Sequence, residues 1–175
     1  YTADLDAALH REGTNGPGVR ARLECYGAWL EEAGRVVAGR GEDLRRVLLS
    51  DHGMVDVVGG VDVMGALAPL SHRWPRDYVP FFDSTFARFW WSADGARREV
   101  RAALDALGGG HWLADDELAR AGVRFADHAY GDDVFLLDPG RLLVPSFMGA
   151  RPLAGMHGYA AEHPDRVGPL VLVGC

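Results

Sequence analysis

Apolar residues recur at intervals of three and four along two parts of the chain, which is the period of an amphipathic helix. This pattern predicts a long helix over Val19–Arg40, preceded by the turn-rich segment Thr14–Gly18. It predicts a second helix over Ala96–Leu107, ended by three consecutive glycines, and the sequence over Asp115–Ala121 suggests a short acidic helix. Cys25 falls on the apolar pattern of the first helix, so we expect its side chain to be buried.

Short apolar and aromatic runs between these helices predict strands. Val47–Leu49 is typical of a buried strand, and Tyr78–Phe82 and Phe86–Trp91 are rich in aromatic residues. Asp133–Pro145 is predicted to be a hairpin whose turn is Asp138–Gly140. Since helices and strands alternate without a linker or repeat, we expect one α/β domain over residues 1–175, with helices packed on a mixed sheet.

Composition narrows the possible classes of protein. The chain has 175 residues, 48% of them hydrophobic, which suits a globular domain with a sizeable core. Its net charge of −7 and the lack of a basic run argue against a nucleic acid polymer as partner. All 18 basic residues are Arg, a bias typical of a high-GC, bacterial genome, and without Lys there is no Schiff-base or P-loop chemistry. No apolar run reaches the roughly 20 residues of a membrane span.

Histidines beside glycines and carboxylates carry the candidate chemistry. Asp51 and His52 follow the predicted strand over Val47–Leu49, and His157 stands in Gly-Met-His-Gly-Tyr. Asp6 and His10 are four residues apart, so a helix would place both on one face. Carboxylate and imidazole are ligands for zinc or a similar divalent ion, and five of them exceed what one catalytic zinc usually takes. The set therefore suggests two ions in one cleft, with zinc as first choice and manganese or iron as alternatives.

The remaining histidines and the hydroxyl pair after Asp83 are weaker candidates. We expect Asp83, Ser84 and Thr85 to be structural, since no His lies near them in sequence. The remaining histidines lie in polar, loop-like stretches and are expected to be surface or structural residues: His72, His111, His128 and His163.

Three motifs in the same order give a family resemblance. Asp6–Gly13, Leu49–Met54 and Gly155–Tyr159 resemble those of the type I phosphodiesterase and nucleotide pyrophosphatase family of the alkaline phosphatase superfamily. The resemblance extends to Phe82–Phe89 and to Phe135–Gly140, so it spans nearly the whole chain. It implies an αβα sandwich with a mixed, mostly parallel sheet and flanking helices, of which this chain is a C-terminal part.

The resemblance also implies a ligand assignment. One metal ion would be held by Asp6, His10 and His157, and the other by Asp51 and His52 together with an Asp and a nucleophilic Thr or Ser. The last two are expected upstream of the first residue, so the fragment alone is expected to lack its nucleophile.

The implied function is a hydrolase that cleaves a phosphodiester or pyrophosphate bond of a small phosphate ester, using two divalent metal ions. Alternatives are a phosphomonoesterase, sulfatase or phosphonate hydrolase of the same superfamily, or a relative that binds metal or a phosphorylated ligand without turnover. The lack of a signal-peptide pattern slightly favours the cytoplasm, but localisation stays open because the N-terminus is expected to be missing.

Overall fold

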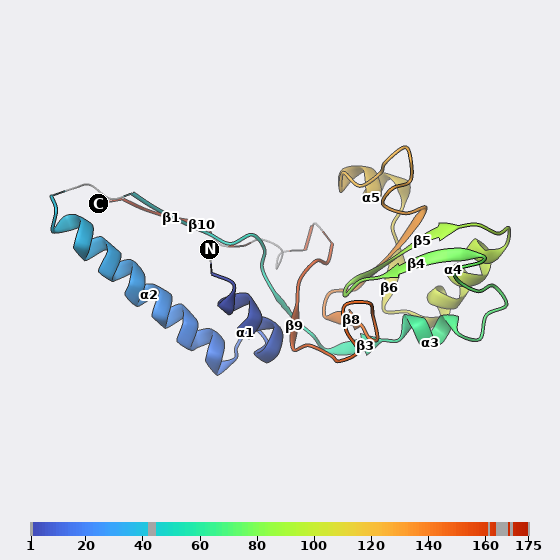
Figure 1. The fold of residues 1–175 in the computed structure, drawn as a ribbon, viewed down its shortest axis with the longest axis horizontal. Coiled ribbons are helices and arrows are strands. Elements are labelled where there is room, and N and C mark those ends of the chain that lie inside the picture. Colours follow the sequence, from blue (N-terminus) through green and yellow to red (C-terminus); the bar gives the residue numbers. More distant parts are fainter. Residues whose placement is uncertain (1, 42–44, 161, 164–167, 169, 175) are drawn as a thin grey trace. The chain divides into compact units, whose positions relative to one another are not determined.

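The computed structural model describes residues 2–41, 45–160, 162–163, 168 and 170–174 (Figure 1). Contacts divide the chain into two compact units. Unit 1 comprises Tyr1–Asp56, Leu153–His157 and His163–Cys175, and unit 2 comprises Val57–Pro152 and Gly158–Glu162. We describe each unit separately. The expectation of one α/β domain over residues 1–175 stays a prediction.

Unit 1 begins with two helices joined by a tight turn, drawn in blue in Figure 1. The predicted long helix is present as α2 (Pro17–Ala38), and α1 (Asp4–Glu12) precedes it. Gly13 ends α1 with a φ of 76°, a left-handed value that glycine adopts without strain, and its N–H donates to the Leu9 carbonyl. Among the described helices, none combines the length and apolar character needed to cross a bilayer.

The described strands of unit 1 form two antiparallel ladders. β1 (Arg45–Leu49) pairs with β10 (Leu170–Gly174), and β2 (Val55–Asp56) pairs with β9 (Gly155–Met156). α1 lies against β9, where the Ala154 N–H donates to the His10 carbonyl at 2.8 Å. The β2–β9 ladder thus brings the residues just before β2 and just after β9 close to α1.

Unit 2 is built on a sheet of strand order β4-β5-β7-β6. α4 covers it with an apolar stripe, since Ala96, Val100 and Leu104 recur every four residues and are fully buried. They pack with Tyr78, Phe82, Phe89 and other buried side chains from the sheet and α3. The elements of unit 2 are β3 (Gly59–Val61), α3 (Val63–Leu67), β4 (Tyr78–Phe82), β5 (Phe86–Trp91), α4 (Ala96–Leu107), β6 (Gly110–Trp112), α5 (Asp115–Arg120), β7 (Asp133–Leu137) and β8 (Arg141–Leu143).

The α/β class is confirmed, with several sheets and flanking helices, but strand direction and one pairing differ from expectation. Among the described pairings, β3–β8 is parallel and the others are antiparallel, so a mostly parallel sheet is not seen. The predicted hairpin is wrong: β7 and β8 are strands, and the turn between them forms, but β7 pairs with β5 and β6 while β8 pairs with β3. Both Leu142 and Leu143 are buried, as is usual for a strand in a parallel pair.

Two burial predictions in unit 1 are wrong. Cys25 is exposed, and along the same helix Leu23 and Trp29 are more than half exposed, at 54% and 57%. Val47 and Leu49 of β1 are also exposed, because β1 belongs to a two-stranded ladder. Periodicity predicted these elements correctly, but it does not show whether another element covers them. Cys175 lies outside the described residues.

Candidate metal centre

The centre begins on α1, where Asp6 and His10 lie on one helical face as their spacing predicts. The His10 Nε2 atom is 3.4 Å from Asp6 Oδ1. The other ring nitrogen, His10 Nδ1, is 2.8 Å from the Gly155 carbonyl oxygen of β9. A carbonyl oxygen only accepts hydrogen bonds, so Nδ1 carries a proton, and in the neutral ring the lone pair is then on Nε2, the nitrogen nearer Asp6.

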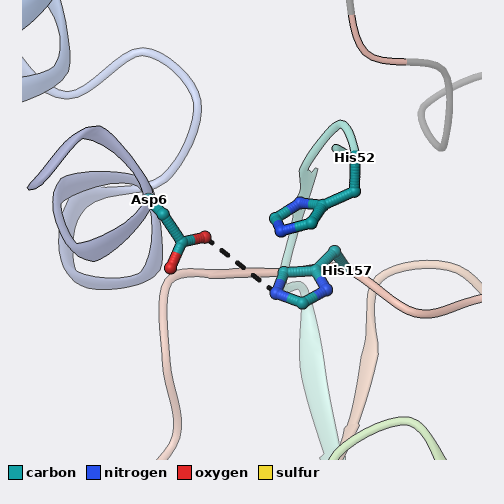
Figure 2. Close-up of side chains that lie close together, drawn as sticks. All are labelled: Asp6, His52 and His157. Atoms are coloured by element: carbon teal, nitrogen blue, oxygen red, sulfur yellow. Dashed lines mark ion pairs between the residues drawn. The ribbon is translucent and has the colours of Figure 1, made fainter. Parts of the chain in front are cut away.

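The β2–β9 ladder brings in the other two histidines. His52 precedes β2 and His157 directly follows β9, and their rings stack with centroids 3.7 Å apart. His52 Nδ1 is 2.9 Å from the Gly53 carbonyl oxygen, a contact that in the neutral ring favours the tautomer with the lone pair on Nε2. In Figure 2 the His52 and His157 rings lie one above the other, and the Asp6 carboxylate from α1 points towards His157.

Ligand atoms of Asp6, His52 and His157 all lie within 4.8 Å of one another. Asp6 Oδ1 is 3.9 Å from His157 Nε2, and the His10 ring centroid is 5.2 Å from that of His157. Asp51 lies at the edge of this group, mostly exposed, with Oδ1 3.6 Å from His52 Nε2. All five predicted residues therefore belong to one part of unit 1, although their roles as ligands stay a prediction.

The donor set fits a divalent cation. Asp6 Oδ1 is buried and has no hydrogen-bond partner among the described residues, a costly condition for a carboxylate oxygen. Atoms that bind a tetrahedral zinc ion at about 2.0 Å lie about 3.3 Å apart, close to the 3.4 Å between Asp6 Oδ1 and His10 Nε2. A cation beside Asp6 Oδ1 would supply the partner that this oxygen lacks.

Electrostatics keep His157 in the form that binds metal. Burial lowers the pKa of the His157 imidazole below its ordinary value of 6.5, and the neighbouring His52 and His10 rings lower it further. Asp6 and Asp51 act in the opposite direction but do not reverse the shift. A neutral imidazole at neutral pH is the metal-binding form.

Backbone groups and one turn orient the centre, and these were not predicted from the sequence. The carbonyls of Gly155 and Gly53 hold the rings of His10 and His52. Asp56 accepts hydrogen bonds from the Thr14 N–H at 2.6 Å and the Thr14 hydroxyl at 2.8 Å, which ties the end of α1 to β2. The only sequence signals were glycines beside the histidines and the turn-rich run that starts at Thr14.

In the Asp83–Thr85 run, expected to be structural, the Thr85 hydroxyl and the Asp83 carboxylate make hydrogen bonds within unit 2. Thr85 is buried in unit 2 and donates to the Gly158 carbonyl at 2.8 Å. Asp83 accepts a hydrogen bond from the Ser84 N–H at 2.6 Å in the turn between β4 and β5. Within unit 1, the Ser50 hydroxyl donates to the His52 carbonyl at 2.6 Å and shapes the loop that carries His52.

Comparison with solved structures identifies the fold. Murine ectonucleotide pyrophosphatase/phosphodiesterase 5 matches 95% of this chain with a TM-score of 0.71 and 19% identity. An inactive form of that protein in complex with AMP matches with a TM-score of 0.74 and 18% identity over the same share. Phosphonoacetate hydrolase from Sinorhizobium meliloti 1021 in complex with phosphonoacetate matches 95% of the chain with a TM-score of 0.66 and 19% identity.

The chain therefore shares its fold with these nucleotide pyrophosphatase/phosphodiesterase and phosphonoacetate hydrolase structures, in line with the motif resemblance. The chain spans 44% of the length of the murine protein and 43% of the hydrolase. At this identity the likeness establishes the fold alone. The sequence matches no protein-family model and no curated protein.

Proposed function

We propose that this chain is the C-terminal, metal-binding part of a phosphohydrolase that cleaves a phosphodiester or pyrophosphate bond. The observation that carries the proposal is the convergence of Asp6, His10, His52 and His157. Asp6 Oδ1 is buried there and makes no hydrogen bond to the described residues. The fold likeness supports it, since the matched proteins are a nucleotide pyrophosphatase/phosphodiesterase and a phosphonate hydrolase.

The proposed ligand sets follow the family resemblance. Asp6, His10 and His157 would hold one divalent ion, and Asp51 and His52 would help to hold the second. Zinc is our first choice for this mixture of imidazole and carboxylate, and manganese and iron are alternatives. Two such ions neutralise charge on a phosphoryl group and lower the pKa of a hydroxyl bound to them.

The chain's own residues prepare this site in three ways. His10 and His52 are held in the tautomer that offers Nε2, which removes the cost of reorienting them when a ligand arrives. His157 is kept neutral by its surroundings, and Asp6 offers an oxygen that has already lost its water. We assign the attacking hydroxyl to the upstream Thr or Ser that the resemblance implies.

The substrate we propose is a small phosphate ester. The inactive form of the murine protein is in complex with AMP, which is a small phosphate ester. Phosphonate hydrolysis is the second candidate, because phosphonoacetate hydrolase also matches 95% of the chain. Monoester and sulfate ester hydrolysis, or binding without turnover, are the further alternatives that the same ligands permit.

Metal binding by the 175-residue chain is the first test. We expect zinc bound at equilibrium dialysis to be lost in Asp6→Asn and His157→Ala, and retained in His111→Ala. The control replaces a half-exposed histidine of unit 2 that lies outside the centre. Metal content unchanged in both centre variants would contradict the assignment.

Turnover is tested with the upstream segment present. Bis-p-nitrophenyl phosphate, p-nitrophenyl phosphate, phosphonoacetate and p-nitrophenyl sulfate would be compared with and without a chelator. A chelator-sensitive preference for the diester supports the proposal. Preference for the monoester, the phosphonate or the sulfate ester would contradict it and favour the alternative activity on that substrate. Retained metal without turnover of any of the four would favour a binding role.

A further inference from the structure

Arg88 lies in the middle of β5 in unit 2, surrounded by aromatic rings. Phe86 and Trp90 are two positions away on either side, so their side chains share its face of the strand. Phe81 of β4 is opposite Arg88 in the ladder, and Tyr130 approaches from the loop before β7. The Arg88 Cζ atom is 4.6 Å from the ring centroids of Phe81 and Tyr130, 5.6 Å from Trp90 and 5.7 Å from Phe86. We call these five residues the Arg88 cage.

Arg88 has no acidic partner among the described residues. Its Nε–H is buried and unpaired, and its guanidinium donates to none of the acceptors in the described part of the chain. On the opposite face of the same sheet, two arginines do have an acidic partner. The Asp133 carboxylate accepts a hydrogen bond from Arg97 Nε at 2.7 Å, and its Oδ1 atom is 3.3 Å from Arg101 Nη1. The chain has 25 acidic and 18 basic residues, so the lack of a partner at Arg88 is not a shortage of carboxylates.

The rings explain why the charge is tolerated but not why its donors are unused. Aromatic faces attract a guanidinium through their quadrupoles, by about 0.5–2 kcal/mol for each well-placed pair. They do not accept the hydrogen bonds that the N–H groups make in the guanidinium plane. A buried donor left unpaired costs about 1–3 kcal/mol, a cost that a bound oxyanion would remove.

The cage is held in place by other contacts. The Trp90 Nε1–H donates to the His128 carbonyl at 2.8 Å, and His128 adopts a φ of 56° that is uncommon outside glycine. The His128 ring is paired with Asp132, its Nδ1 lying 2.8 Å from the carboxylate. The ring centroids of Phe86 and Tyr130 are 6.2 Å apart. Fixed walls reduce the entropy that a ligand loses when it binds.

Charge and shape define the ligand class. A planar guanidinium with free edge donors matches a planar carboxylate, which it binds through two parallel hydrogen bonds. A single cation suits a single negative charge, and Asp83, whose charge acts on Tyr130, disfavours a dianion such as phosphate. The rings around Arg88 are half-buried, so they leave apolar surface beside the guanidinium that the body of an aromatic ligand can contact.

We propose that the Arg88 cage is a binding site for an aromatic carboxylate, in which Arg88 pairs with the carboxylate and the surrounding rings contact the aromatic body. The site lies within unit 2 and does not depend on the metal centre or on the proposed function.

Arginine Nε–H signals of the ¹⁵N-labelled chain in a two-dimensional NMR spectrum test the proposal. The Arg88 signal is assigned by its absence from the spectrum of Arg88→Lys. Benzoate is the probe, acetate supplies the carboxylate without the ring, and benzyl alcohol supplies the ring without the charge. We expect a saturable shift of the Arg88 signal with benzoate, at an affinity at least about 10-fold higher than with acetate.

Variants separate the cage from general electrostatics. Arg88→Met, which keeps much of the stem, and Arg88→Lys, which keeps the charge but not the planar fork, should each weaken benzoate binding by about 10-fold or more. Arg98→Met makes the same charge change as Arg88→Met at an exposed position of α4 and should leave the affinity unchanged. If Arg88→Met does not fold, wild type and Arg88→Lys decide. The proposal is overturned by no saturable shift in wild type, by equal affinity for acetate, or by an equal loss in Arg98→Met.

Discussion

Asp6→Asn is the substitution that best separates a metal ligand from a structural ion pair. The change keeps the shape of the side chain and removes its charge. If Asp6 serves only as the helical partner of His10, the variant should lose about 0.3–0.5 kcal/mol of stability and nothing else. If Asp6 is a ligand, the metal-free chain should hardly suffer, because the buried Oδ1 atom has no hydrogen-bond partner to lose.

The magnitudes follow from the contacts around Asp6. An amide in place of the carboxylate can donate to His10 Nε2, which relieves part of the about 1–3 kcal/mol cost of an unpaired buried group. Loss of a negative charge from the first turns of α1 costs about 0.3–1 kcal/mol in the opposite direction. We therefore expect the metal-free variant to be as stable as wild type or up to about 2 kcal/mol more stable.

Metal should reveal the difference. At a free zinc concentration 1,000 times the dissociation constant, binding stabilises the folded chain by about 4.1 kcal/mol. Loss of an outer-shell partner weakens metal affinity by up to about 100-fold, so loss of a ligand should weaken it by at least that much. At the same zinc concentration, binding would then stabilise the variant by about 1.4 kcal/mol at most. The difference of about 2.7 kcal/mol corresponds to about 5–11 °C in Tm for a chain of this size.

The assay is thermal unfolding followed by circular dichroism, with and without zinc. Asp105→Asn is the matched control, since it makes the same change at an exposed position of α4. A full zinc-induced rise in Tm in Asp6→Asn would refute the ligand role of Asp6. Destabilisation of the metal-free variant by several kcal/mol would also contradict the ligand role, because the Asp6 carboxylate would then stabilise the fold by far more than its helical ion pair with His10 provides.

Two further predictions concern the support of the centre and acid stability. An added Cβ at Gly155 would lie 2.6 Å from the Leu9 carbonyl oxygen, so Gly155→Ala should lower the free energy of unfolding by about 1–3 kcal/mol and weaken zinc binding. Denaturant titration measures the first effect and zinc titration the second. Gly149→Ala is the control, since its Cβ meets open space and should change neither quantity. Hydrogen bonds from the backbone and side chains of Ser71–His72 lower the pKa of Glu99 from 4.5 to about 2. The ionised carboxylate therefore stabilises the fold above about pH 4.5, and this contribution is lost as the pH falls towards 2. Urea midpoints of Glu99→Gln should vary less with pH over that range than those of wild type, and an unchanged slope would refute the assignment.

Local signals in the sequence predicted the elements well. Tyr78–Phe82 and Phe86–Trp91 are strands with the predicted bounds, and Ala96–Leu107 is a helix with an apolar stripe. Each element is marked by apolar residues that recur every two residues, or every three to four, or by a nearby turn. These signals all lie within one short stretch of sequence. Local physics is therefore sufficient for their existence and bounds.

Partner choice depended on distant parts of the chain and was predicted less well. The turn at Asp138–Gly140 forms, since the Arg141 N–H donates to the Asp138 carbonyl at 2.9 Å. The chain after it nevertheless pairs with β3, where Gly59 is opposite Arg141, about 80 residues earlier. A turn fixes the direction of the chain, whereas the pairing depends on which apolar surface the next strand can bury. The exposure of Cys25 has the same origin, since periodicity cannot show whether a covering element exists.

The candidate centre combines both kinds of information. Asp6 and His10 could be paired from their helical spacing, and Asp51 and His52 are neighbours in sequence. The stacking of His52 on His157 required the β2–β9 ladder, which joins residues about 100 positions apart through strands of two residues each. Such short strands carry almost no periodic signal, so only the chemistry of the histidines and the order of the motifs pointed to this meeting. The residue types of the centre could thus be predicted from the sequence, and its geometry could not.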